Sequence, residues 1–259
     1  MANHTVTARN DAAASENLIH DDLVAQRYGF RGGLVPGVTV YAYATRAVVD
    51  ELGPDWLGRG TIEFRLPGPL YEHELATATA TRTDDGSAAV QLTGPEGRQC
   101  LSATATVTAT DPLEVARGGD LPGTRPPASE TSLAPGTVLA PVGKTFDAAA
   151  QLEYLDFLDD DLPLYRREGI AHPGWLSRYC NRVLAANVLL EPWIHVGTAI
   201  RHHGLLRDGE ELEVRGVVVD NWERKGHRFV DLDVAMTGDG RPLASARHTA
   251  IWRVRQSEG

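Results

Sequence analysis

The sequence repeats one pattern at a constant offset of 137 residues, the separation of Gly37 from Gly174. Three short matches share this offset and link the two halves of the chain: Pro36-Gly37 with Pro173-Gly174, Thr61 with Thr198, and Glu74-Leu75 with Glu211-Leu212. A register kept across helix, turn and strand patterns predicts two copies of one supersecondary unit. We therefore expect a duplicated scaffold.

The first copy combines one long helix with several strands. Apolar residues recur at helical spacing from Val38 to Leu52, and Gly53-Pro54 ends the pattern. Four segments rich in Thr, Val and Ala, separated by turn residues, are predicted as strands: 60–66, 74–83, 88–92 and 101–110. One helix wrapped by antiparallel strands is an α+β layout.

The second copy follows the same order after a linker. Residues 111–136 hold five prolines and four glycines without apolar periodicity, which predicts a linker. The segments expected beyond it are extended at 137–146, helical at 148–158 and 174–190, and strands at 194–203, 211–221, 229–236 and 244–254. The chain is thus predicted to divide into an N-terminal unit (1–110), the linker and a C-terminal unit (137–259).

Composition excludes several classes of function. The net charge of −10 argues against non-specific binding to nucleic acid or to an anionic membrane, because both need clustered Lys and Arg. No apolar run approaches the roughly 18 residues that span a bilayer, and no signal peptide opens the chain, so we expect a cytoplasmic protein. Cys100 and Cys180 lie far apart without a CxxC partner, and we expect neither a disulfide framework nor a metal site.

The segment ahead of the first long helix resembles a known family motif: an Asp-x-Asn-Pro-(Leu/Ile)-His stretch, an Ala soon after it, and a Gly that opens the central helix. The residues that match in order and nearly in spacing are Asn17, Ile19, His20, Asp22, Ala25 and Gly37. This segment is similar to the MaoC-like dehydratases, the (R)-specific enoyl-CoA hydratase family. The resemblance implies a double hotdog fold, with two antiparallel sheets each wrapping a long central helix.

The chain departs from the family pattern at two positions. Ser15 stands where the family has its catalytic aspartate, and Leu18 replaces the motif proline. Losing a general acid or base typically costs about 10²- to 10⁴-fold in rate. Either another group substitutes, the nearest in sequence being Glu16, Asp21 and Asp22, or the reaction differs from plain hydration.

The second copy carries a degenerate form of the same segment. Asp160 and Pro163 are kept, Tyr165 stands at the histidine position, and the stretch up to Gly174 is much shorter than the one from His20 to Gly37. Double hotdog proteins of this type commonly keep one working site. We therefore expect a single site, in the first copy.

The resemblance implies roles for three residues. His20 is the expected general acid/base, Asn17 orients it or a substrate carbonyl, and the Gly37 amide polarises the carbonyl. The other residues expected at the substrate are Ser15, Asp22, Val35, Pro36, Tyr41 and His172. Structural interpretations stay open, with His20 as a cap, Asn17 in a turn and Tyr41 in the core. His195 is interpreted as structural.

The sequence thus predicts a lyase that hydrates, dehydrates or otherwise adds to an α,β-unsaturated carbonyl compound. The family implies acyl thioesters of coenzyme A or acyl carrier protein as substrates and no tightly held cofactor. The missing aspartate leaves room for a small metabolite that is not a thioester. The alternatives are a hotdog thioesterase and a non-catalytic ligand-binding protein. A monomer or a homodimer is expected.

Overall fold

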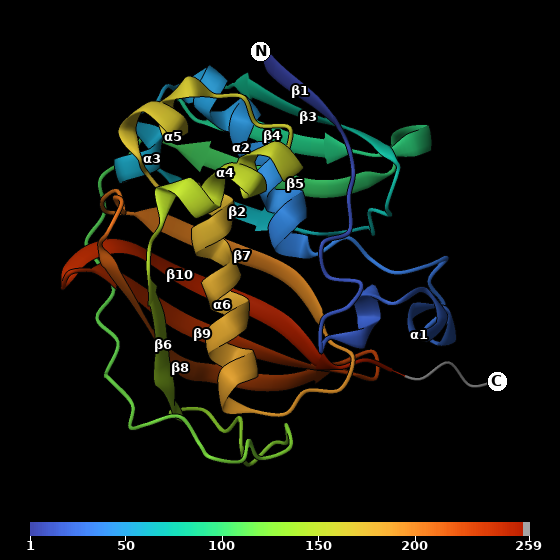
Figure 1. The fold of residues 1–259 in the computed structure, drawn as a ribbon. Coiled ribbons are helices and arrows are strands. Elements are labelled where there is room, and N and C mark those ends of the chain that lie inside the picture. The colour runs from blue at the N-terminus through green and yellow to red at the C-terminus, as the bar shows by residue number, and fades with distance from the viewer. Residues whose placement is uncertain (256–259) are drawn as a thin grey trace.

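Ten strands form one continuous antiparallel sheet in the computed structural model, which describes residues 1–255 (Figure 1). In sheet order, the strands are β1 (Ala2–Thr7), β3 (Leu75–Arg82), β4 (Ala88–Thr93), β5 (Gln99–Thr106), β2 (Thr61–Arg65), β7 (Ile194–His202), β10 (Arg241–Arg253), β9 (His227–Gly238), β8 (Glu211–Arg224) and β6 (Val138–Thr145). Read outward from the centre, the two halves have matching orders, β2-β5-β4-β3-β1 and β7-β10-β9-β8-β6. The duplication expected from the sequence therefore appears as an approximate two-fold relation.

The expectation of two separate sheets is wrong in one respect, because the halves join through β2 and β7. These strands pair antiparallel, with Ile62 opposite Ile200 and Phe64 opposite Thr198. Ile62, Phe64 and Ile200 are all buried. An unpaired edge in either half would leave backbone donors and acceptors without partners. Pairing them satisfies these groups within one chain.

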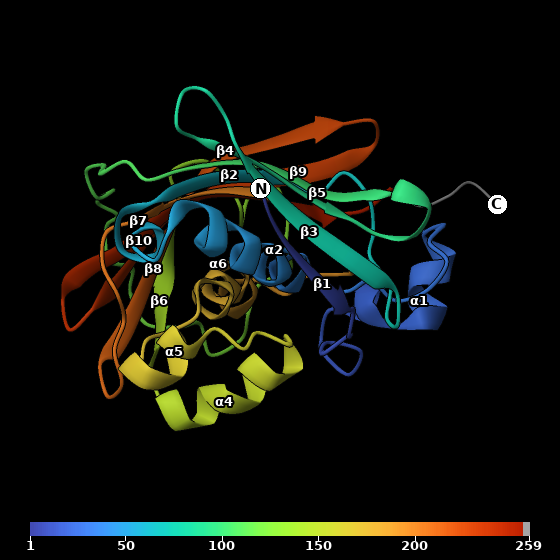
Figure 2. The same cartoon turned by 90° about the horizontal axis from the view of Figure 1, so that it is seen from above.

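Two long helices lie side by side on one face of the sheet (Figure 2). They are α2 (Gly37–Leu52) and α6 (Pro173–Asn187). Gly174 allows their close contact, because a methyl group at this position would overlap Ala42. On the side away from the sheet lie α4 (Ala148–Phe157) and α5 (Pro163–Glu168). The remaining helical segments are short: the 3₁₀ turns η1 (Leu18–His20) and η2 (Pro95–Gly97), with α1 (Asp22–Arg27) and α3 (Trp56–Arg59).

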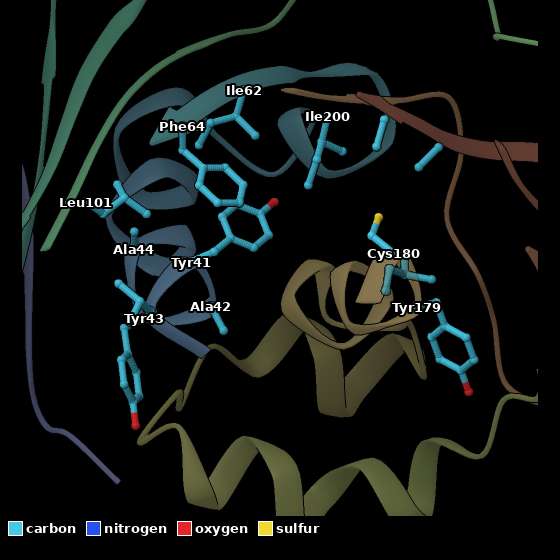
Figure 3. Close-up of a cluster of buried hydrophobic side chains, with 14 of the residues drawn as sticks. Tyr41, Ala42, Tyr43, Ala44, Ile62, Phe64, Leu101, Tyr179, Cys180 and Ile200 are labelled. Carbon is cyan, nitrogen blue, oxygen red and sulfur yellow. The ribbon is translucent and has the colours of Figure 1, made fainter. Parts of the chain in front are cut away.

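Helix α2 is buried on nearly every side, because the sheet and α6 cover it. Its Tyr41 is fully buried and stacks on Phe64 of β2, with ring centroids 4.7 Å apart. Figure 3 shows this pair, with Tyr43 pointing away from it. A helix that is apolar all round belongs to a core. Tyr41 therefore packs as a core residue.

Residues 111–136 cross from one half to the other without a helix or a strand of their own. Val115 and Leu133 are buried, and Pro127 forms an isolated bridge with Leu189. The segment thus lies against the C-terminal half of the fold. The division of the chain at residues 110 and 136 stays a prediction. Within residues 1–255 no helix is both long and apolar enough to cross a membrane.

Candidate active site

A cavity of about 200 Å³ lies beneath the overhang, the segment 8–36 that connects β1 to α2. Its walls are mostly apolar and come from both halves of the chain: Ile19, Phe30, Leu34, Val35, Pro36, Gly37, Val40, Leu66, Pro67, Gly68, Pro69, Leu70, Trp193 and Ile194. The polar side chains that line it are Asn17, His20, Asn181 and His195. A mostly apolar cavity with a few convergent polar groups is typical of a small-molecule site.

Short polar contacts give the overhang its shape. The Asp21 carboxylate accepts from the Val24 amide at 2.9 Å and caps α1. The Asp22 carboxylate accepts from the Gly33 amide at 2.7 Å, which folds the chain back after α1. Asn10 donates to the backbone carbonyl of His20 at 2.9 Å. Together these bonds hold the backbone of His20 at the cavity wall.

The contacts of the His20 ring determine which nitrogen carries the proton. Nδ1 lies 2.6 Å from the carbonyl oxygen of Leu34, which can only accept, so Nδ1 is the donor. Nε2 lies 3.3 Å from the amide nitrogen of Asn17, which can only donate. Burial lowers the pKa of His20 from its ordinary value of 6.5. At neutral pH the ring is therefore uncharged, with the lone pair on Nε2.

Asn17 connects the overhang to the other half of the chain. Its Oδ1 accepts from the backbone amide of Trp193 at 3.1 Å, and its Nδ2 donates to the carbonyl of the same residue at 3.0 Å. The other hydrogen of the amide group is directed to His20 Nε2. An asparagine makes all of these bonds at once, because it carries two donors beside an acceptor.

The first turn of α2 leaves backbone donors open beside the cavity. Pro36 is the N-cap and contributes no side-chain hydrogen bond. The amides of Thr39 and Val40 bond to the Pro36 carbonyl, whereas the Gly37 and Val38 amides have no acceptor among residues 1–255. Free amides at a helix N-terminus carry partial positive charge. This corner can stabilise an oxygen that gains negative charge.

A wider cavity of about 590 Å³ adjoins the first. The residues that line both are Asn17, His20, Pro36, Asn181 and Trp193. Ser15, Glu16 and Arg125 line only the wider one, where Glu16 and Arg125 pair at 2.9 Å. His20 therefore lies at the junction between the two cavities.

The structure brings together five of the nine residues expected from the sequence. Asn17, His20, Val35, Pro36 and Gly37 line the smaller cavity. Ser15 lines the wider one, and Asp22, Tyr41 and His172 line neither. No carboxylate lines the smaller cavity within residues 1–255. Glu16, Asp21 and Asp22, the nearest candidates to replace the family aspartate, make the contacts described above.

His172 closes the corresponding corner of the second half. Its Nδ1 accepts from the Gly174 amide at 3.0 Å, so it caps α6. Its Nε2 lies 3.2 Å from the Asp160 carboxylate, and the Tyr165 ring packs against it. All three side chains are buried. Side chains thus fill the N-terminus of α6, whereas the N-terminus of α2 opens on a cavity.

The site residues expected from the sequence do not include Asn181, Trp193 and His195, which also line the cavity. All belong to the second half, far in sequence from the motif. Asn181 is an uncharged polar residue near the middle of α6, which is a weak signal because Arg178 and Arg182 lie within one turn of it. Its Oδ1 is buried and lacks a hydrogen-bond partner in the described part of the chain.

Comparison with known proteins identifies the fold. The sequence matches no protein-family model and no curated protein. An assigned MaoC domain protein dehydratase from Chloroflexus aurantiacus superimposes with a TM-score of 0.64 at 13% identity, over 96% of this chain and 93% of that one. A conserved hypothetical protein from Mycobacterium tuberculosis, with a double hotdog fold, gives 0.62 at 16%, over the same shares.

The structural neighbours also include a protein named for a second activity. An assigned oleoyl thioesterase from Lactobacillus plantarum has a TM-score of 0.57 at 12% identity, over 99% of this chain and 97% of that chain. MaoC-like dehydratases and thioesterases thus share this architecture. The fold of this chain is a double hotdog, and its function has to be argued from the site.

Proposed function

We propose that this protein is a lyase of the hydratase/dehydratase type that acts on an α,β-unsaturated acyl thioester. One observation carries the proposal: an uncharged His20, with its lone pair on Nε2, lines the same cavity as the N-terminus of α2. A base beside oxyanion donors is what addition of water to an enoyl thioester needs.

The reaction follows from these positions. Water displaces the long 3.3 Å contact of Asn17 from His20 Nε2, and Nε2 takes a proton from this water as the water oxygen bonds to the β-carbon of the substrate. The electrons of the double bond move onto the thioester oxygen, which the Gly37 and Val38 amides stabilise. The proton on Nε2 then passes to the α-carbon, which completes the addition of water. A single imidazole takes and returns the proton, and dehydration is the same sequence reversed.

The shape of the site fits an acyl group on a carrier. The smaller cavity offers an apolar chamber for the acyl chain, and the wider one leads away from His20 past polar and charged side chains. Coenzyme A and acyl carrier protein both present their acyl groups on a long flexible arm. We propose that this arm enters through the wider cavity.

The test is an assay with crotonyl-CoA and trans-2-hexenoyl-CoA. Loss of the enoyl absorbance without release of free thiol supports the lyase. Release of thiol supports the thioesterase, in which His20 would activate water toward the carbonyl carbon. If neither substrate reacts, the lyase proposal fails for short-chain acyl-CoA thioesters, and the acyl carrier protein thioesters are assayed next.

The pH dependence of kcat/KM provides a further prediction. The base must be neutral, and burial lowers the pKa of His20 below 6.5. Activity should therefore be at its plateau at pH 7 and fall as the pH drops through the lowered pKa. The measurement is kcat/KM from pH 4.5 to 8, which reports on the free enzyme. An acid limb centred at or above pH 6.5 would contradict this assignment.

A further inference from the structure

His195, at the start of β7, approaches the N-terminus of α2 from the second half of the chain. The side chain is buried and lines the smaller cavity. A methyl group on Gly37 would lie 2.8 Å from His195 Nδ1, so the nitrogen directly faces the first residue of α2. Nδ1 has no hydrogen-bond partner among residues 1–255. Buried polar atoms are almost always bonded, so this one calls for an explanation.

The other nitrogen of His195 belongs to a buried chain of hydrogen bonds. Nε2 lies 2.7 Å from the hydroxyl of Thr198, which lies 2.9 Å from Nδ1 of His248 on β10. The two imidazole rings are 4.4 Å apart between centroids, and all three side chains are buried. These hydrogen bonds hold the His195 ring in one orientation.

The single hydroxyl proton of Thr198 restricts the tautomers. If the hydroxyl donates to His195 Nε2, then His195 carries its proton on Nδ1, facing the cavity. In the opposite arrangement Nε2 of His248 carries a proton that has no acceptor within residues 1–255. Either arrangement leaves one N–H without an acceptor in the described residues. On His195 Nδ1 this N–H faces the smaller cavity, where a ligand can accept it, whereas His248 lines neither cavity and would leave it buried without an acceptor. The first arrangement is therefore favoured.

We propose that His195 is a second catalytic imidazole, which donates its Nδ1–H to the thioester oxygen beside the Gly37 and Val38 amides. This role rests on the proposed function and deepens it. Thr198 and His248 are positioning residues, because they fix the tautomer without reaching the substrate. The site thus combines an imidazole from each half of the chain.

Burial supports a donor role rather than a second base. It lowers the pKa of His195 to about 3, so the ring is uncharged at neutral pH. A neutral imidazole can polarise a carbonyl by donating a hydrogen bond without transferring its proton. His20, at the junction of the cavities, remains the proton carrier.

The test measures polarisation of a bound carbonyl. Butyryl-CoA labelled with carbon-13 at the carbonyl has no double bond and so cannot be hydrated. Its infrared carbonyl band should move to lower frequency on binding to the wild type. We expect His195→Leu to lose part of this shift and to lower kcat on crotonyl-CoA by about 10²- to 10³-fold, as for loss of one oxyanion donor. His195→Asn, whose amide nitrogen can take the place of Nδ1, should recover part of both.

Two further comparisons separate this role from a structural one. His202 lies on the same strand, is equally buried and packs against Trp56, but does not line the cavity. His202→Leu therefore measures the general cost of removing a buried imidazole and should keep the band shift. If His195→Leu does not fold, Thr198→Val tests the same role by removing the hydroxyl that links His195 to His248. Its control is Thr198→Ser, which keeps the hydroxyl. Thr198→Val should weaken the shift, whereas Thr198→Ser should not.

The outcomes distinguish this inference from the proposed function. A shift that persists in both His195→Leu and Thr198→Val overturns the inference, whatever the turnover. The absence of any shift when butyryl-CoA binds the wild type also overturns it, as does failure of butyryl-CoA to bind. A shift that depends on His195 in a protein that does not hydrate crotonyl-CoA upholds the inference and refutes the hydratase for short-chain acyl-CoA thioesters.

Discussion

Replacing His20 with glutamine is expected to lower kcat/KM on crotonyl-CoA by roughly 10²- to 10⁴-fold, the usual contribution of a general acid/base. Glutamine places its amide group near the position of Nε2, and the 2.6 Å bond from Nδ1 to the Leu34 carbonyl is lost. It has no lone pair of comparable basicity for the proton of water. The loss should therefore appear mainly in kcat, with a smaller change in KM. Steady-state kinetics at pH 7 would measure both.

A matched control is His227→Gln. His227 begins β9, outside both cavities, and its Nδ1 accepts from the Arg255 amide at 3.1 Å. This variant should keep wild-type kinetics. Unchanged turnover in His20→Gln would place the chemistry elsewhere and would remove the central residue of the proposed mechanism. Equal losses in the two variants would indicate a general effect of removing histidine.

Local signals in the sequence were sufficient to predict the two long helices and the duplicated order of strands. The first helix runs from Gly37 to Leu52, as the apolar spacing and Gly53-Pro54 indicate. The second, predicted over 174–190, ends at Asn187. Its final apolar residues, Val188 and Leu190, continue the helical spacing, but the Asn187 side chain bonds to both backbone groups of Ala140 and fixes the end of the helix there. Such a long-range contact has no local signal.

The joining of the two halves through β2 and β7 could not be predicted from the sequence either. The alternation of apolar and polar residues along β2 indicates that Ile62 and Phe64 face inward. It does not indicate which strand pairs with the free edge of β2. The cavity depends on the same event, because joining β2 to β7 brings His195 to Gly37. The motif therefore predicted the contribution of the first half, His20 with Asn17 and Gly37. The contribution of the second half could not be predicted without the pairing.

Proximity in sequence was a poor guide to what replaces the family aspartate. Helix ends and turns need acceptors for their free amides, and short carboxylates satisfy them readily. Asp21 and Asp22 serve that need in the overhang. Apart from Asn17, the polar side chains that share the cavity with His20 lie more than 150 residues away, at Asn181 and His195.

The second half uses the same kinds of side chain for stability. Asp160 accepts from the Leu162 amide at 3.0 Å, lies 3.2 Å from His172 Nε2 and 3.4 Å from Arg46, and is only 3% exposed. These contacts join α2 to the N-terminus of α6. Despite burial, which acts in the opposite direction, the hydrogen bond from His172 helps to lower the pKa of Asp160 to about 2.

Asp160→Ala is accordingly expected to lower the free energy of unfolding by about 3 to 5 kcal/mol, because it leaves buried partners without their acceptor. Asp161→Ala is the matched control: Asp161 pairs with the same Arg46 but is 88% exposed, and should cost less than about 1 kcal/mol. Urea unfolding at pH 7 measures both. The lowered pKa of Asp160 means that its stabilisation is present above pH 3.8 and is lost as the pH falls toward 2, so the gap between wild type and Asp160→Ala should narrow over that interval. Equal losses in the free energy of unfolding for the two variants would show that the contacts of Asp160 do not stabilise the N-terminus of α6.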